Sequence, residues 1–158
     1  MAKSKYINYF KNKNILITGG TGLIGMPLAQ LLIDLGAKIS IVSLDKKPKL
    51  KGKFKFLKKD LRELKNCIQI CKNQEIVFHL AGVKGSPLMT MKKPASFLVP
   101  TVTFTFNMME AARRSGVKRF LLTSSIGVYA KSKIFNEDSV WKTFPSENDK
   151  FAGWAKRL

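Results

Sequence analysis

Several features are scarce in this chain of 158 residues, and each scarcity excludes a class of protein. With two cysteines and one histidine, neither a disulfide scaffold nor a Cys/His metal site is expected. Cys67 and Cys71 are four residues apart in a segment that favours a helix, so we expect ordinary reduced cysteines. No apolar run approaches the ~20 residues that cross a bilayer, and the start lacks a signal-peptide core. We therefore expect a cytoplasmic protein with no membrane partner and no metal.

Acidic residues are also few: 10 Asp and Glu stand against 29 Lys and Arg, which gives a net charge of +19. A basic surface attracts phosphates, and the stretch from Lys46 to Lys59 is especially rich in lysine. Arginine is scarce, however, and the stretch lacks the Arg forks and stacking aromatics of base readout. Its Phe54 and Phe56 alternate with lysines, as on one buried face of a strand. We expect a lysine-rich solvated surface rather than a nucleic-acid site.

What the chain does have is a core, with 45% apolar residues, and a regular alternation of strands and helices. One domain over residues 1–158 is expected. The pattern predicts a mostly parallel, doubly wound α/β sheet with helices on both faces. The predicted strands are 14–18, 38–44, 54–57, 75–80 and 119–123; the predicted helices are 23–35, 61–72 and 102–115, the last starting near Pro100, and another begins within 148–158.

The first strand runs directly into a glycine-rich loop, Gly19-Gly20-Thr21-Gly22-Leu23-Ile24-Gly25. Glycines permit a tight turn from strand to helix, and they let the backbone approach a pyrophosphate at the N-terminus of that helix. The spacing is GxxGxxG. Because the loop lies between a strand and a helix, it predicts a dinucleotide site.

Two acidic residues follow the next two predicted strands. Asp45 ends the second strand twenty residues after Gly25, where a carboxylate can accept hydrogen bonds from ribose hydroxyls and repel a 2′-phosphate. This favours NAD over NADP, although Lys46 and Lys47 leave room for NADP. Asp60, before Leu61, either caps the following helix or reaches the adenine amino group.

These motifs, with His79-Leu80-Ala81-Gly82 and Thr123-Ser124-Ser125-Ile126-Gly127-Val128-Tyr129, resemble the extended short-chain dehydrogenases/reductases. More narrowly, the chain resembles the NAD-dependent epimerase/dehydratase family that acts on nucleotide sugars. The resemblance implies a Rossmann domain, bound NAD, and a hydride taken from a sugar carbon and later returned. The residues expected to bind the cofactor are Gly19, Gly22, Leu23, Ile24, Gly25, Asp45, Asp60, Leu61, Leu80, Ala81, Gly82 and Lys156.

The resemblance also implies catalytic residues. In the family, a Ser or Thr after the fifth strand bonds the reacting sugar oxygen, and a Tyr-x-x-x-Lys pair supplies the base. Ser125 matches the serine, with Ser124 as the fallback, and Lys156 matches the lysine. Ala152 stands where the tyrosine is expected. We expect Tyr129 to support the pocket without acting as the base.

Two further departures bear on function. Thr101 stands where relatives carry an Asn that orders the nicotinamide end, whereas Asn107 matches a later, mostly structural Asn. Family members also extend well beyond the lysine, so we expect the substrate-binding portion to be absent. The alternatives are therefore an epimerase/dehydratase, a non-catalytic or truncated NAD-binding module, and a basic nucleic-acid binder. The family implies a homodimer if the last helix is completed.

Overall fold

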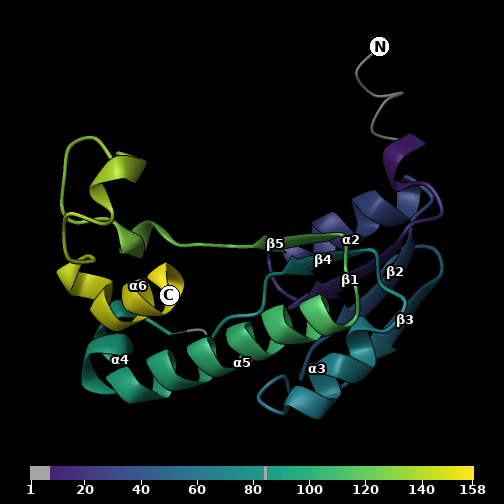
Figure 1. The fold of residues 1–158 in the computed structure, drawn as a ribbon, viewed down its shortest axis with the longest axis horizontal. Helices are drawn as coiled ribbons and strands as arrows, with labels where there is room; N and C mark the ends of the chain where they lie inside the picture. The colour runs from purple at the N-terminus through teal and green to yellow at the C-terminus, as the bar shows by residue number, and fades with distance from the viewer. Residues whose placement is uncertain (1–7, 84) are drawn as a thin grey trace. The chain divides into compact units, whose positions relative to one another are not determined.

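Five short apolar segments form the strands of one parallel sheet in the computed structural model, which describes residues 8–83 and 85–158. The strand order is β3-β2-β1-β4-β5, so the central strand is the first in the chain (Figure 1). The strands are β1 (Asn14–Thr18), β2 (Lys38–Val42), β3 (Phe54–Leu57), β4 (Ile76–His79) and β5 (Arg119–Leu122). The chain moves outward from β1 to β3 and then crosses to β4, which places a topological switch point between β1 and β4.

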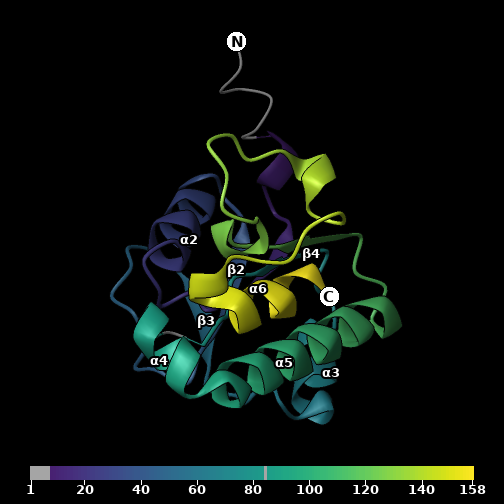
Figure 2. The same cartoon turned by 90° about the vertical axis from the view of Figure 1, so that its left-hand side faces the viewer.

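Helices cover both faces of this sheet (Figures 1 and 2). Helix α2 (Gly25–Asp34) connects β1 to β2 on one face. Helix α3 (Leu64–Cys71) and the C-terminal half of α5 (Pro94–Arg114) connect strands in the opposite direction. Because such crossovers are right-handed, the reversal of direction puts them on the other face. The predicted doubly wound, Rossmann-like α/β fold is therefore confirmed.

The core follows the two-residue alternation of the strands. Ile15, Ile17, Ile39 and Ile41 pack in one cluster with Ala29 and Leu32 of α2. Leu16 alternates with Ile15 and Ile17, so it faces the opposite side of the sheet, and it is fully buried. Each fully buried aliphatic side chain stabilises the fold by roughly 1.5–3 kcal/mol.

The chain divides into two units by its internal contacts, and α5 contributes to both. Unit 1 comprises residues 8–81 and 106–122 and contains the whole sheet. Unit 2 comprises the described residues of 82–105 and 123–158. It contains α4 (Pro87–Lys92), the first half of α5, the 3-10 turns η1 (Ile126–Val128), η2 (Glu137–Ser139) and η3 (Glu147–Asp149), and α6 (Lys150–Arg157). The expectation of a single domain over 1–158 stays a prediction.

The prediction that the long helix starts near Pro100 is wrong. Helix α5 begins at Pro94, in the first turn where a missing N–H matters little, and Pro100 lies inside it. Phe97, Thr101 and Phe104 are buried at helical spacing on both sides of this proline. Burial of one continuous face thus outweighs the hydrogen bond that Pro100 removes.

Two further helices, α4 and α6, are short. Helix α4 was not predicted, although Ser86 gives a usable signal: its side chain accepts a hydrogen bond from the Met89 N–H at 3.3 Å and caps the helix. Helix α6 confirms the predicted helix near the end of the sequence.

Candidate functional site

The glycine-rich loop joins β1 to α2 through a turn that other residues could not make. Gly19 has φ +67°, and its N–H donates to the Val42 carbonyl at 2.9 Å. The Gly22 N–H then donates to the Gly19 carbonyl at 3.0 Å and closes the turn. A Cβ on Gly25 would lie 2.3 Å from the Gly19 oxygen. The loop and the start of α2 therefore pack backbone against backbone.

The N-terminus of α2 has no side-chain cap. Its N-cap residue, Ile24, offers no hydrogen-bonding side chain, and the first turn of the helix contains no acidic residue. The side chains of Leu23 and Ile24 are 91% and 64% exposed, so they contribute nothing to the core here. Helix N-termini carry partial positive charge and N–H groups without intrahelical partners. This end of α2 suits an anion.

The end of β4 passes directly over the same loop. A Cβ on Gly19 would lie 2.8 Å from the Ala81 nitrogen and 2.9 Å from the Leu80 carbonyl carbon. The Leu80 N–H donates to the Thr18 carbonyl at 3.1 Å, and the Ala81 N–H donates to the Thr18 hydroxyl oxygen at 3.3 Å. The structure thus brings Leu80 and Ala81 to the glycine loop, at the switch point between β1 and β4.

Thr18 and His79 support this edge of the sheet. They are register partners on β1 and β4, both fully buried, and Thr18 Oγ1 lies 2.8 Å from His79 Nδ1. Neither side chain is among the residues predicted to form the site. The signal was available, because both residues end apolar strands, and a buried polar residue there needs a partner.

Asp45 lies beyond the end of β2 rather than within it, since the strand stops at Val42. Its Oδ2 accepts a hydrogen bond from the Thr21 hydroxyl at 2.6 Å and another from the Ser43 hydroxyl at 3.1 Å. The Asp45 N–H in turn donates to Ser43 Oγ at 3.2 Å. Thr21 belongs to the glycine loop, so these bonds tie the carboxylate to that loop. Sequence reasoning missed both hydroxyls.

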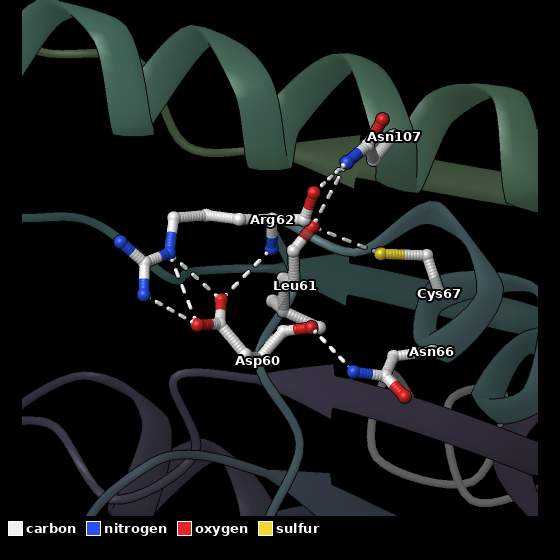
Figure 3. A network of polar contacts seen from close by, with 6 residues as sticks. All are labelled: Asp60, Leu61, Arg62, Asn66, Cys67 and Asn107. Carbon is white, nitrogen blue, oxygen red and sulfur yellow. Dashed lines mark hydrogen bonds and ion pairs between the residues drawn. The ribbon is translucent and has the colours of Figure 1, made fainter.

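Asp60 is held by its neighbour Arg62 (Figure 3). The Arg62 guanidinium donates to both carboxylate oxygens of Asp60, and its Nη2 lies 2.6 Å from Asp60 Oδ2. The backbone N–H of Arg62 also donates to Asp60 Oδ1 at 2.9 Å. These bonds hold the pKa of Asp60 below its ordinary value. The alternative that Asp60 caps the following helix is wrong, because α3 starts at Leu64 and its N-cap residue is Glu63.

Leu61 is buried beside Asp60, and its backbone rather than its side chain makes the polar contacts (Figure 3). The Leu61 carbonyl accepts hydrogen bonds from Asn107 Nδ2 at 3.2 Å and from the Cys67 thiol at 3.2 Å. Asn107 also donates to the Arg62 carbonyl at 2.8 Å. These bonds tie α5 to the segment after β3, which is the structural role predicted for Asn107.

The two serines belong to unit 2. Ser125 is the N-cap of η1, and its hydroxyl oxygen accepts a hydrogen bond from the Gly127 N–H at 3.1 Å. Accepting this bond leaves the hydroxyl proton as a donor. Ser124 is exposed. Gly82, also in unit 2, is exposed, and a Cβ added there would meet nothing within 4 Å.

Lys156 lies on α6, which packs closely against η1. A Cβ on Gly153 would lie 2.4 Å from the Gly127 carbonyl oxygen, so the two segments meet at a glycine. Unit 2 therefore brings the element of Ser125 beside the element of Lys156. Burial lowers the pKa of Lys156. Ala152 precedes Lys156 by four residues, about one helical turn, on the same side of α6.

Arg157 anchors α6, and sequence reasoning missed it. Its side chain is buried, its Nε donates to the Val128 carbonyl at 2.9 Å, and its terminal nitrogens donate to the carbonyls of Val128 and Thr143. Its guanidinium also lies 5.4 Å from the centre of the Trp154 ring. Lys156 is the preceding residue of the same helix. Tyr129, at the end of η1, packs its ring against Phe135 with 5.2 Å between centroids.

A parallel sheet in the order β3-β2-β1-β4-β5, with a glycine loop at its switch point, defines a Rossmann-type chain. Comparison with known sequences makes the assignment narrower. The family model described as "NAD dependent epimerase/dehydratase family" matches residues 15–150, and the chain belongs to this family.

Individual relatives fit this assignment. GDP-mannose 3,5-epimerase 1 of rice (Oryza sativa subsp. indica) is 30% identical over 142 residues, which cover 84% of this chain and 38% of that protein. A 3 beta-hydroxysteroid dehydrogenase/Delta 5-->4-isomerase of Mycobacterium tuberculosis is 31% identical over 121 residues, which cover 72% of this chain and 32% of that protein. The structure of MoeE5 in complex with UDP-glucuronic acid and NAD is similar, with a TM-score of 0.77 and 28% identity; the match covers 91% of this chain and 47% of MoeE5. The chain thus spans less than half the length of each of these relatives.

Within residues 8–83 and 85–158, no helix has the length and apolarity needed to cross a membrane. The predictions of a cytoplasmic location and of a homodimer stay predictions.

Proposed function

We propose that this chain is the cofactor-binding part of an NAD-dependent oxidoreductase of the epimerase/dehydratase type that acts on a nucleotide sugar. The observation that carries the proposal is the close packing of the glycine loop, in which neither Gly19 nor Gly25 has room for a Cβ. That packing leaves the uncapped end of α2 open to a pyrophosphate. The match to the family and the NAD named with MoeE5 support the same cofactor.

In this proposal, the parts of NAD bind along the carboxyl edge of the sheet in unit 1. The backbone N–H groups of Leu23, Ile24 and Gly25 hold the pyrophosphate beside Gly22, whose own N–H closes the turn, and Asp45 accepts hydrogen bonds from the adenosine ribose. Thr21 and Ser43 already orient that carboxylate through their hydroxyls. A carboxylate there disfavours the 2′-phosphate of NADP. The remaining predicted contacts in unit 1 are Asp60, Leu61, Leu80 and Ala81, and Gly82 is predicted from unit 2.

The catalytic residues proposed for unit 2 are Ser125 and Lys156. When bound, NAD supplies a hydride acceptor that becomes a hydride donor. The Ser125 hydroxyl donates a hydrogen bond to the reacting sugar oxygen, and the Lys156 ammonium donates to the nicotinamide ribose. The contact of Gly153 with Gly127 and the bond from Arg157 to the Val128 carbonyl, which join their two elements, support this pairing.

Ala152 limits the chemistry, because its methyl group cannot take a proton. The loss of a general base typically reduces a rate by about 10²- to 10⁴-fold. A non-catalytic NAD-binding module is therefore the second candidate, and Ala152 is the observation that favours it. Water or a group of the substrate would have to act as the base if the chain turns over.

The first experiment is calorimetric titration of the chain with NAD and with NADP. Wild type should bind NAD more tightly than NADP. Asp45→Ala should reduce the affinity for NAD by about tenfold or more, as expected for lost hydrogen bonds to a charged group. Asp138→Ala is the matched control, because it removes one exposed carboxylate from η2. Equal affinities in both variants, or no NAD binding by wild type, would contradict the cofactor site.

The second experiment separates the two candidates. The chain and its Ala152→Tyr variant are incubated with NAD and with UDP-glucose, UDP-glucuronic acid, GDP-mannose or a 3β-hydroxysteroid, and products are followed by mass spectrometry and NADH absorbance. Conversion of a sugar that increases in the variant supports the enzyme. Conversion of the steroid alone would overturn the proposed substrate class. NAD binding without conversion by either form favours the non-catalytic module.

A further inference from the structure

A cavity of about 590 Å³ lies at the amino ends of β1, β2 and β3 in unit 1. The glycine loop and Asp45 follow the carboxyl ends of the strands, so this cavity lies at the opposite edge of the same sheet. We call it the amino-edge cavity. Its volume is within the usual range for sites that bind small molecules.

Four lysines line the amino-edge cavity: Lys38, Lys53, Lys55 and Lys72. They come from the start of β2, from the start of β3 and from the end of α3. Among the described residues that line it, none is acidic. The carboxylate of Glu75, beside Asn14 of the lining, is paired with Lys13 at 2.7 Å. The cavity therefore concentrates positive charge without a local counter-charge from its lining.

Ordinary structural roles explain only part of this cluster. Lys55 lies on the edge strand β3, where lysine hinders pairing with another chain. Lys72 is the C-cap residue of α3, where a cation complements the helix dipole. Neither role requires the lysines of three separate elements to converge on one hollow. All four side chains are exposed along one hollow, where a single anionic ligand can reach several ammonium groups at once.

Gln74 adds a second, independent feature. It lines the cavity, and its Oε1 is buried without a hydrogen-bond partner in the part of the chain that the structure describes. A buried acceptor without a donor costs about 1–3 kcal/mol. This oxygen needs a donor, which a ligand hydroxyl can supply, and the N–H₂ group of the same amide can donate to a phosphate oxygen.

We propose that the amino-edge cavity binds a small molecule that carries phosphate groups, at a site separate from the glycine loop. Lysine ammonium groups act as point charges for phosphate oxygens, and the Gln74 amide adds a directional bond. The size of the cavity favours a small phosphorylated ligand over a nucleic-acid strand, which would instead spread over the whole lysine-rich surface.

The test uses sodium tripolyphosphate as the probe in calorimetric titrations at moderate ionic strength. The double variant Lys53→Ala/Lys72→Ala removes two charges from the cavity. The matched control, Lys131→Ala/Lys133→Ala, removes two exposed charges from unit 2. Circular dichroism checks that both variants fold. With NAD at saturation, so that the glycine loop is occupied, we expect one tripolyphosphate per chain, affinity reduced about tenfold or more in the cavity variant, and little change in the control.

Several results would overturn this inference: no saturable binding, equal weakening in both variants, or displacement of tripolyphosphate by NAD. Equal weakening, together with binding of single-stranded RNA that both variants weaken alike, would mean diffuse surface charge. Each variant is titrated with NAD separately, so failure of the cofactor site and failure of the amino-edge cavity give different patterns. A Gln74→Leu variant that loses affinity while all lysines remain would support the proposed geometry.

Discussion

Replacing Gly25 by alanine should disturb the glycine loop far more than it disturbs the rest of the fold. The new Cβ would lie 2.3 Å from the Gly19 oxygen and 2.6 Å from the Gly20 Cα. Both neighbours are backbone atoms, so no side chain can rotate away. The loop or the start of α2 must move by about 1 Å to restore ordinary van der Waals distances.

The magnitude follows from two opposed effects. Overpacking of this kind typically destabilises a fold by about 1–3 kcal/mol. Alanine favours a helix over glycine by up to about 1 kcal/mol, but Gly25 is the first residue of α2, so this gain is small. We expect the free energy of unfolding to fall by roughly 1–2 kcal/mol. A shift of about 1 Å in the backbone N–H donors should also reduce the affinity for NAD by about tenfold or more.

Urea denaturation measures the first effect, and calorimetry measures the second. Gly116→Ala is the control, because Gly116 has φ +68° while a Cβ there would meet nothing within 4 Å. It should lose about 1 kcal/mol through backbone strain and bind NAD as wild type does. If Gly25→Ala keeps both its stability and its NAD affinity, the close packing of the loop has no functional consequence and the reasoning fails.

Three further predictions concern other residues. Arg157→Ala should lower the free energy of unfolding by about 2–4 kcal/mol in urea titrations, and Arg157→Lys should not restore it, because only the guanidinium can bond both carbonyls. Lys156→Met should raise the free energy of unfolding at pH 7, because burial lowers the pKa of Lys156 and the folded chain therefore disfavours the ammonium form. This gain in stability should vanish as the pH rises through the unfolded pKa of 10.5, where the lysine is neutral in both states. Burial raises the pKa of Cys67 to about 11 and of Cys71 to about 12, so Ellman's reagent at pH 8 should label both thiols only after denaturation.

The sequence was sufficient for the parts of this protein that depend on local pattern. Apolar runs such as Ile15–Ile17 predict buried strands, and the glycines after them predict the turn into α2, because glycine adopts a positive φ, as Gly19 does, at no steric cost. Short buried strands that alternate with helices permit few topologies, and the parallel sheet was among them. The family resemblance added the candidate residues at the carboxyl ends of the strands.

The tertiary structure decided what depends on partners distant in sequence. Asp45 is oriented by Thr21 and Ser43, and Arg157 reaches the carbonyls of Val128 and Thr143; no local spacing indicates such pairs. In the sequence, Pro100 predicts the start of a helix. In the structure α5 continues through Pro100, because the buried side chains before and after it compensate for one lost hydrogen bond. The amino-edge cavity forms where β1, β2, β3 and the end of α3 meet, so only the folded chain shows that these four surface lysines line one hollow.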